Sequence, residues 1–444
     1  MQNKPPVAYE KSRVNFRGKG IAISSFMEKL KTLFGEHKLI VAMVFLSIAV
    51  RALLVLNGGR ALFDSGQDAP SYFDAAQDFN SYGWFSSDIR TLPLWPAGYP
   101  FFLSIFIVIS ENLWWLLVVI FQHAFYISAV LYFYFSLRDL LPILARRFLT
   151  GILLFMPTFL YSPSENMYES ALFSLLLVAT SAAITSVSSE SLEVKPKLLF
   201  ICILFYGMAG FIQPKTAPIG LLVLLVIGFH LRKMSIALLG PLALWGALLL
   251  SIRSYIALGI LNPSTNFGLA IINGGAKFQC QLQTNPLLNA GQSSASTDRQ
   301  NTICAIKFFV THPFDLFAHI AKQAHYLYGP IDGGGIPRAS TWFHGLGFIR
   351  IAEFLGISNK PLLLRIENIG ALILNFAIIC GFVIAFRRID RLKIILISLP
   401  IIIISLVHFI SLGDSRYRLP IIAFQMFFLT VFLTHAIERF KQKK

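Results

Sequence analysis

Residues 63–100 have the sequence FDSGQDAPSYFDAAQDFNSYGWFSSDIRTLPLWPAGYP, the one long polar break in the amino-terminal half of the chain. Apolar runs come before and after it. The stretch holds five of the 22 acidic residues: Asp64, Asp68, Asp74, Asp78 and Asp88. Because one hydrophobic helix would enter this stretch and another would leave it, we expect it to lie against a membrane face. Carboxylates gathered there indicate chemistry on a substrate located at that face.

The composition of the whole chain is that of a membrane protein. Of its 444 residues, 55% are hydrophobic and only 14% are charged, and the mean hydropathy is +0.66. A soluble protein of this size needs more charge to cover its surface. The long and numerous apolar runs predict an all-α polytopic membrane protein, a bundle of about ten transmembrane helices.

The formal net charge of +16 follows the expected topology rather than a nucleic-acid surface. Lys and Arg gather in the amino-terminal tail, near residues 138–147, 232–233 and 387–393, and at the carboxyl terminus. These clusters recur at every second connection, which is the positive-inside pattern. We therefore expect both termini in the cytosol and no nucleic-acid partner.

The order of polar and apolar segments divides the chain into four parts. We expect a basic cytosolic tail over 1–38, followed by transmembrane helices 1–7 over 39–253 with a first outer loop at 57–112. An extracytoplasmic region over 254–360 follows, and 361–444 holds helices 8–10 and a short cytosolic tail. The apolar run Tyr99–Ser110 is too short to cross a membrane.

The cysteines fall into two groups. Cys202 and Cys380 lie inside apolar runs, where cysteine behaves as a small hydrophobic residue. Cys280 and Cys304 lie in the region expected outside the cytosol, where a disulfide persists, and the sequence leaves their pairing open. No metal-ligand spacing is present. We predict no cofactor, and whether a divalent metal takes part stays open.

Asp68 has two interpretations. If Ala69–Phe79 is a short helix, Asp68 occupies its N-cap, and Pro70 lies in the first turn, where a missing N–H does no harm. A catalytic carboxylate is the alternative, and the residues alone favour the cap. Asp74 and Asp78 are like charges four residues apart, so we expect them on a solvated face.

Ordered motifs on the predicted outer side carry a family resemblance. Asp68, Tyr72 and Ala76 give the pattern DxxxYxxxA. The later motifs, in chain order, are PAGYP at 96–100, SENMYE at 164–169, GMAGFIQPK at 207–215, SIRSY at 251–255, STNFGLAIINGG at 264–275, HP at 312–313 and SRYRLP at 415–420. The set resembles the GT-C glycosyltransferases, in particular the ArnT-like and protein O-mannosyltransferase-like group of glycosyltransferase family 39. The match covers about 39–275 and the last span, and is loose over 278–360.

The resemblance implies a reaction. The aspartate of the first outer loop is the catalytic base in that family, and Asp68 matches it. The enzyme would be a hexosyl- or pentosyltransferase that uses a polyprenyl-phosphate sugar and inverts the anomeric configuration. The acceptor hydroxyl would belong to a cell-envelope glycan, a lipid or a protein on the extracytoplasmic face of a bacterial inner membrane.

A leaving lipid phosphate needs cations at the same face. The candidates are Arg253, Arg416, Arg418 and Lys215. Each also fits an interfacial anchor whose side chain extends to the lipid headgroups. The family often has Arg-Pro where this chain has Gln213-Pro214, so Lys215 is expected to supply that charge.

Further substrate contacts are expected from the tyrosines of the motifs, Tyr72, Tyr99 and Tyr417, and from Glu165. Glu165 also fits a helix start, where an acidic residue favours the helix dipole. Arg51 is a charge within a membrane span and is a functional candidate for that reason. It lies in the outer half of the span, however, where it also fits a residue that reaches the interface.

Two other functions are compatible with the sequence. A transporter or flippase of lipid-linked sugars would need polar residues along a path through the membrane, whereas the ionisable residues here gather at the outer face. No internal repeat is visible, which also disfavours an inverted-repeat transporter. A polymerase or ligase of the O-antigen type relies on basic residues in large outer loops, so 254–360 is compatible with it.

Overall fold

A computed structural model describes residues 37–65, 68–86, 96–188, 193–259, 261–262, 292–328, 360–411 and 415–442. The chain divides into Met1–Leu46 and Ser47–Lys444. The contacts that build the site lie within Ser47–Lys444.

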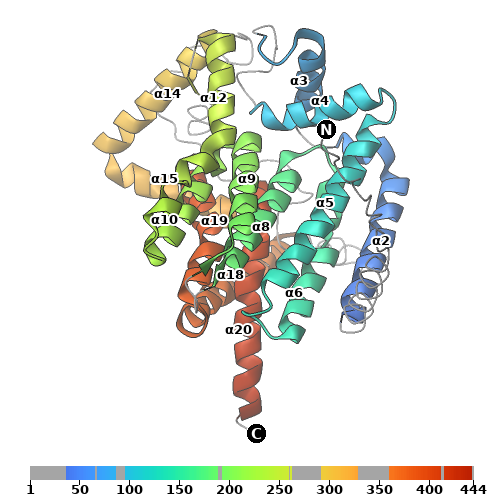
Figure 1. Ribbon diagram of the computed structural model, residues 1–444, viewed down its shortest axis with the longest axis vertical. Coiled ribbons are helices and arrows are strands. Elements are labelled where there is room, and N and C mark those ends of the chain that lie inside the picture. The colour runs from blue at the N-terminus through green and yellow to red at the C-terminus, as the bar shows by residue number, and fades with distance from the viewer. Residues whose placement is uncertain are drawn as a thin grey trace, which may run out of the picture. The chain divides into compact units, whose positions relative to one another are not determined.

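The described residues are almost entirely helical (Figure 1). The α-helices are α2 (Lys38–Phe63), α3 (Ala69–Tyr82), α4 (Gly98–Ile109), α5 (Trp114–Ser136), α6 (Ile143–Phe155), α7 (Pro157–Tyr161), α8 (Tyr168–Ser186), α9 (Pro196–Ile212), α10 (Ala217–His230), α11 (Met234–Ala237), α12 (Trp245–Leu258), α14 (Gln292–Thr311), α15 (Pro313–Tyr328), α18 (Lys360–Arg388), α19 (Arg391–Ile410) and α20 (Ile422–Gln442). Short 3₁₀ turns are η1 (Ser162–Ser164), η2 (Pro214–Thr216), η3 (Gly240–Leu244) and η4 (Ser415–Ile421). The one described strand pair is β1 (Val187–Ser188) with β2 (Glu193–Val194), antiparallel, with Val187 opposite Val194.

The all-α polytopic class is confirmed. Within the described ranges, seven helices are long and apolar enough to cross a membrane, or up to nine if each bent pair is one span. The sequence predicts about ten, because it counts α9 and α10 as separate spans and does not count the bent pair that runs from Asp298 to Tyr328. Helices α9 and α10 have 17 and 14 residues, or roughly 25 and 21 Å of helix, which is less than a bilayer core of about 30 Å.

The centre of the bundle is α8. Of its most apolar 18-residue stretch, 89% of the residues are buried. The helix packs against α9 on one side and α5 on the other. Glycines permit the closest helix contacts. A Cβ added at Gly246 of α12 would lie 2.0 Å from the carbonyl oxygen of Gly207 in α9, and one at Gly381 of α18 would lie 1.9 Å from the carbonyl of Phe428 in α20. These are the small-residue contacts typical of membrane helix pairs.

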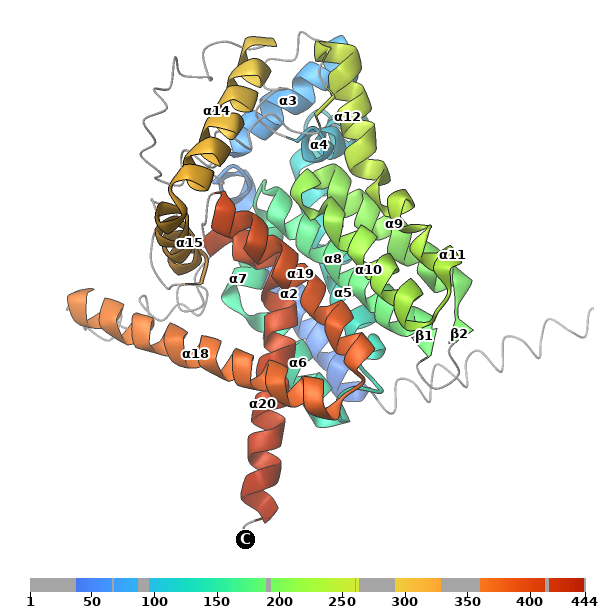
Figure 2. The same cartoon turned by 90° about the vertical axis from the view of Figure 1, so that its left-hand side faces the viewer.

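The two ends of the bundle differ. At one end, α3 and α4 lie beside the carboxyl-terminal part of α12 (Figures 1 and 2). The opposite end holds the strand pair and the connection from α18 to α19 (Figure 2). The first end carries the DxxxYxxxA and PAGYP motifs, which the sequence predicts outside, and the second carries the basic connection from α18 to α19, which it predicts inside (Figure 2).

Helix α3 confirms the short helix predicted after Asp68 and extends it to Tyr82. The residue that follows it is Gly83, whose φ of 85° favours glycine. The predicted solvated face of α3 is only half correct, because Asp74 is exposed but Asp78 is 3% exposed. Asp78 lies beside Phe79 on the side of α3 that packs into the protein, and four-residue spacing alone does not reveal that contact.

Candidate functional site

The connection from α2 to α3 carries Asp68. Helix α2 ends at Phe63 and α3 begins at Ala69, which leaves Asp68 at the N-cap position. Its side chain makes no capping hydrogen bond with α3 and is partly exposed. In this structure the carboxylate is therefore not used as a helix cap, which was the simpler of the two interpretations of Asp68.

Asn166 holds both sides of this connection. It is fully buried in the turn between η1 and α8. Its backbone N–H donates to the carbonyl of Phe63 at 2.9 Å, and its side-chain Nδ2 donates to the carbonyl of Ala69 at 3.1 Å. The last residue of α2 and the first of α3 are thus bound to one residue. Asn166 fixes the segment that bears Asp68, and no sequence argument singled it out.

Tyrosines from three helices pack next to the start of α3. The ring of Tyr72 lies 5.3 Å from that of Tyr99 and 6.3 Å from that of Tyr168, both edge to face. All three are buried. Burial raises the pKa of the Tyr99 hydroxyl above its ordinary value, and the carboxylate of Glu169 acts in the same direction. Because Tyr72 follows Asp68 by four residues, both lie on one side of α3, the side facing α8.

A narrow cavity continues from this tyrosine cluster. Its volume is about 10 Å³, roughly the space that one water molecule occupies. The lining residues are Tyr168, Glu169 and Leu172 of α8, Gln213, Lys215 and Thr216 at the end of α9, Ile404, Val407 and His408 of α19, and Tyr417 and Pro420 of η4. Two of the predicted substrate-binding residues, Lys215 and Tyr417, thus meet in one cavity.

Polar and aromatic contacts shape the cavity wall. Gln213 Nε2 donates to the Tyr168 hydroxyl at 3.0 Å. The rings of His408 and Tyr417 stack with centroids 4.4 Å apart. Lys215 lies in η2, where Pro214 breaks the helix after α9. The Gln-Pro sequence therefore places a lysine, rather than an arginine, at this helix break.

Arg51 is connected to the same region through a buried chain of hydrogen bonds. Its side chain is 2% exposed, and Nη1 pairs with His123 Nδ1 at 2.9 Å. The other ring nitrogen of His123 pairs with Ser164 Oγ at 2.9 Å. Ser164 is two residues from Asn166. Arg51 is thus bound inside the protein, and through His123 it supports the turn that holds the Asp68 segment.

Arg253 lies near the other end of α3. Its guanidinium carbon is 4.9 Å from the Phe79 ring centre and 4.8 Å from that of Trp84, and Nε donates to the Trp84 carbonyl at 2.8 Å. Phe79 is eleven residues after Asp68, roughly 16 Å along a helix. Arg253 therefore braces the end of α3 and does not line the described cavity.

Arg418 lies in a fully buried network. Its Nε donates to Gln425 Oε1 at 3.0 Å, Nη2 to Asn375 Oδ1 at 3.0 Å, and Nη1 to the Tyr328 carbonyl at 3.3 Å. These bonds connect η4 with α20, α18 and α15. Arg418 thus holds these helices together, and its predicted contact with phosphate stays a prediction. The side chain of Arg416 lies outside the described residues.

The two glutamates of the SENMYE motif lie in different places. Glu165 is buried after η1 but does not line the cavity, whereas Glu169, one turn later, does. The SENMYE motif contains both, and the helix that begins at Tyr168 turns the second toward α19. Glu169 and His408 are cavity residues that sequence reasoning did not select.

Two remaining predictions concern cysteines and metals. Cys280 lies outside the described residues, so its bridge to Cys304 stays a prediction. Cys202 and Cys380 are free. Within the described ranges, no three His, Cys, Asp or Glu side chains form a group able to hold a metal ion.

Comparisons with known proteins give a distant structural likeness. No protein-family model and no curated protein matches the chain. It is similar to the archaeal oligosaccharyltransferase AglB from Archaeoglobus fulgidus in complex with an inhibitory peptide and a dolichol-phosphate, with a TM-score of 0.45 and 12% identity over 91% of this chain and 51% of that one. The apo form of the Archaeoglobus fulgidus oligosaccharyltransferase gives 0.44 with the same identity and coverage. The chain spans about half the length of these proteins.

Proposed function

We propose that the protein is a membrane glycosyltransferase that moves a sugar from a polyprenyl phosphate to an acceptor hydroxyl, with inversion at the anomeric carbon. The observation that supports this most is the placement of Asp68. Asn166 fixes both sides of its segment, and Tyr72 on the same side of α3 packs against Tyr168, a residue of the cavity that holds Lys215 and Tyr417.

The proposed step forms one bond and breaks one at the anomeric carbon, and it moves one proton. The acceptor hydroxyl gives its proton to the Asp68 carboxylate, and its oxygen bonds to the anomeric carbon from the face opposite the phosphate. The bond from that carbon to the phosphate oxygen breaks, and its electron pair stays on the departing polyprenyl phosphate. A positioned base of this kind contributes typically 10²- to 10⁴-fold to the rate.

Lys215 supplies the charge that this step needs. The departing phosphate changes from a singly charged diester to a monoester with more negative charge, so a nearby ammonium group stabilises the products more than the substrates. Tyr417 and Gln213 would donate further hydrogen bonds to the phosphate or the sugar. Glu169, buried beside them, would accept from sugar hydroxyls.

Substrate entry requires the cavity to widen. A volume of about 10 Å³ does not hold a phosphosugar head group. One of its walls, η2, is a short 3₁₀ turn at a helix break, and stretches of this kind often mark a hinge. Movement of η2, which bears Lys215, would widen the cavity beside Tyr168 and Glu169.

The membrane orientation in this proposal follows the charge pattern. The segments that build the site occupy the end of the bundle predicted outside, and the basic connections occupy the other end. The site would therefore act on extracytoplasmic acceptors. The protein would lie in a bacterial-type inner membrane, with both termini on the cytosolic side. The identity of the sugar is left to experiment.

The test compares Asp68→Asn with Asp74→Asn in cells that lack the native gene. Asp74 is exposed on the same helix, so its variant makes the same chemical change away from the proposed site. Mass spectrometry of glycolipids and glycans is expected to show loss of one transferred sugar with Asp68→Asn and a normal profile with Asp74→Asn. A normal profile in both variants would refute the proposal, and a product bearing many sugars would favour the polymerase or ligase class.

A further inference from the structure

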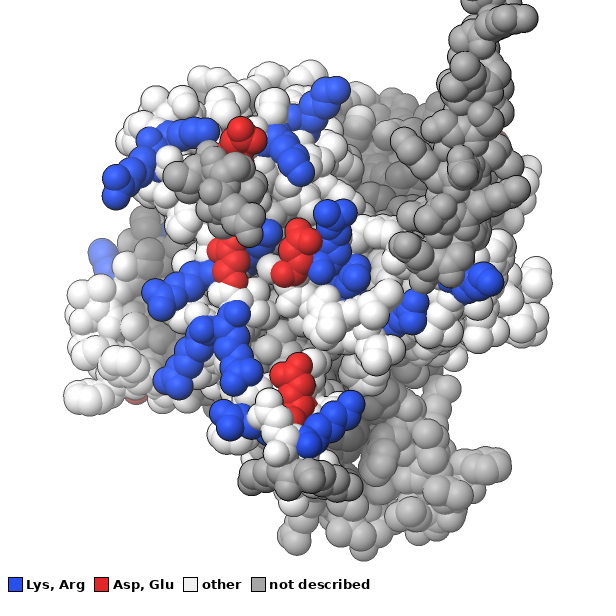
Figure 3. Space-filling model, turned by 60° about the horizontal axis from the view of Figure 1, so that its bottom comes forward, with Lys and Arg blue, Asp and Glu red and all other residues white. Residues whose placement is uncertain are grey.

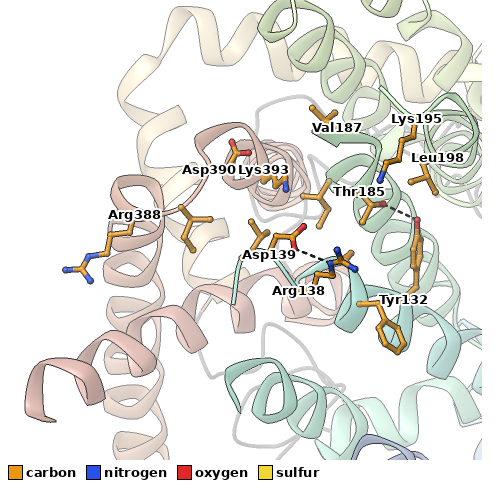
Figure 4. A pocket seen from close by; sticks show the side chains of 15 residues that line it. Tyr132, Arg138, Asp139, Thr185, Val187, Lys195, Leu198, Arg388, Asp390 and Lys393 are labelled. Atoms are coloured by element: carbon orange, nitrogen blue, oxygen red, sulfur yellow. Dashed lines mark hydrogen bonds and ion pairs between the residues drawn. The ribbon is translucent and has the colours of Figure 1, made fainter. Parts of the chain in front are cut away.

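A second cavity lies at the opposite end of the bundle from Asp68. Its volume is about 810 Å³, within the range of small-molecule sites. The end of α5 and the turn after it, the end of α8, the strand pair, the start of α9 and the connection from α18 to α19 form its walls (Figure 4). None of the residues proposed for glycosyl transfer lines it, so whatever it binds does not contact the proposed transfer site.

The charge in this cavity is mainly positive. Arg138, Lys195, Arg388 and Lys393 line it, together with the carboxylates of Asp139 and Asp390. Asp139 is paired with a cation, whereas Asp390 caps α19 and keeps its negative charge in the cavity. Asp139 accepts from Arg138 Nε at 3.2 Å, and Asp390 accepts from the backbone N–H of Leu392 at 3.0 Å. The guanidinium group of Arg388 points away from the other labelled side chains (Figure 4).

Lys195 and Lys393 are left as the two cations directed into the cavity. Their side chains extend from opposite walls toward its middle (Figure 4). Within the described ranges, neither makes an ion pair. Two like charges that face one space repel each other. Once Asp139 is paired with Arg138, only Asp390 among the described lining residues offsets the two lysines. The remaining charge is positive and favours a negatively charged occupant.

The backbone around both lysines is well fixed. Lys195 follows β2, and its backbone N–H donates to the carbonyl of Ser186 at the end of α8, at 2.8 Å. Lys393 lies in the first turn of α19, which Asp390 caps. The amino-terminal end of a helix carries a partial positive charge that adds to that of the lysine. Tyr132 and Thr185 are connected by a hydrogen bond of 3.3 Å across the cavity floor.

We propose that this cavity binds a phosphate group between Lys195 and Lys393. The phosphate would belong either to the headgroup of an anionic phospholipid or to a soluble phosphate compound. Basic pockets between membrane helices on the cytoplasmic side are a known setting for lipid headgroups. Basic side chains are spread widely over this end of the molecule, with few acidic ones among them (Figure 3). Apolar residues such as Phe135, Leu198 and Ile389 also line the cavity, and they suit the glycerol and upper chain of a lipid.

The experiment uses the full-length protein in a neutral detergent. Phosphatidylglycerol or phosphatidylcholine is titrated in and bound lipid is counted by native mass spectrometry, while a parallel titration with inorganic phosphate follows the melting temperature. The test variant is Lys195→Gln/Lys393→Gln. The control variant, Arg387→Gln/Arg439→Gln, removes two exposed charges from helix ends outside the cavity.

The wild type is expected to retain phosphatidylglycerol in preference to phosphatidylcholine, or to be stabilised by inorganic phosphate. The test variant should bind about 30-fold more weakly, because a basic residue contributes about fivefold at an anionic headgroup. The control should stay within about threefold of the wild type. Response to the lipid alone identifies a headgroup site, and response to inorganic phosphate identifies a soluble ligand.

Two outcomes would overturn the proposal. One is a wild type that responds to neither anion, and the other is equal weakening in the test and control variants, which would indicate general surface attraction. If the double variant melts well below the wild type without ligand, the single variants Lys195→Gln and Lys393→Gln replace it, each expected about fivefold weaker. Lys195→Arg/Lys393→Arg should retain binding.

Discussion

Asn166 offers the sharpest test of how the Asp68 segment is held. In Asn166→Ala, the hydrogen bond from Nδ2 to the Ala69 carbonyl is lost, while the backbone bond to Phe63 remains. Ala69 is the first residue of α3, so its carbonyl keeps a partner within the helix. The loss is therefore an ordinary one of about 0.5–1.5 kcal/mol. If this free energy normally keeps the Asp68 segment in its ordered position, the transfer rate should drop about 2- to 13-fold.

Asn166→Asp strengthens the test because it keeps the shape and reverses the hydrogen bond. A carboxylate oxygen would then face the Ala69 carbonyl at a fully buried position, which costs at least about 2 kcal/mol, or about 30-fold in rate. The matched control is Asn80→Ala. Asn80 Nδ2 donates to the Ser104 carbonyl at 3.3 Å, so it links α3 to α4 far from Asp68.

The assay is sugar transfer by purified protein in lipid nanodiscs, with the melting temperature measured on the same samples. Asn166→Asp should lose more transfer activity than Asn166→Ala, and Asn80→Ala should transfer at the wild-type rate. If both Asn166 variants melt lower but transfer at the wild-type rate, the segment does not depend on this clamp and the reasoning is refuted.

Two further predictions distinguish the role of Lys215, which lines the cavity, from that of the buried Arg418. Lys215→Gln should reduce transfer about 10- to 100-fold, since a hydrogen bond to a charged group contributes about 1.5–3 kcal/mol, and Lys215→Arg should restore part of it; equal rates for Gln and Arg would exclude a charge effect. Arg418→Met should instead lower the free energy of unfolding by roughly 2–4 kcal/mol, because three buried acceptors lose their donor. Transfer per folded molecule should be unchanged, and a lowered rate with normal stability would return Arg418 to phosphate binding.

Much of the architecture could be predicted from the sequence because apolar run length determines whether a helix crosses a membrane. The start of α3 after Asp68 was predictable from an N-cap residue followed by Pro70 in the first turn. The count of spans was less accurate at 196–230, where Pro214 divides the apolar sequence into two short helices. Run length does not show whether a broken segment crosses once, twice or not at all.

The members of the site were partly predictable. Lys215 and Tyr417 stood out as polar residues at helix breaks on the predicted outer side, and they line one cavity. Arg418, in the same motif as Tyr417, carries the same sequence signal. Its burial depends on Gln425 two turns later and on Asn375 from another helix, and a linear pattern does not contain such contacts.

Asn166 illustrates the opposite case. An asparagine between two helices is an ordinary turn residue in a sequence. Its importance comes from two carbonyls about a hundred positions earlier in the chain. The motif that contains it suggested the region, but only packing of α8 against the start of α3 identifies this residue.

The most direct measurement of the central claim is the rate at which purified Asp68→Asn protein forms product from a labelled polyprenyl-phosphate sugar. We expect a loss of about 10²- to 10⁴-fold relative to the wild type and to Asp74→Asn, with unchanged binding of the donor. Transfer by Asp68→Asn at the wild-type rate would show that Asp68 does not accept the proton.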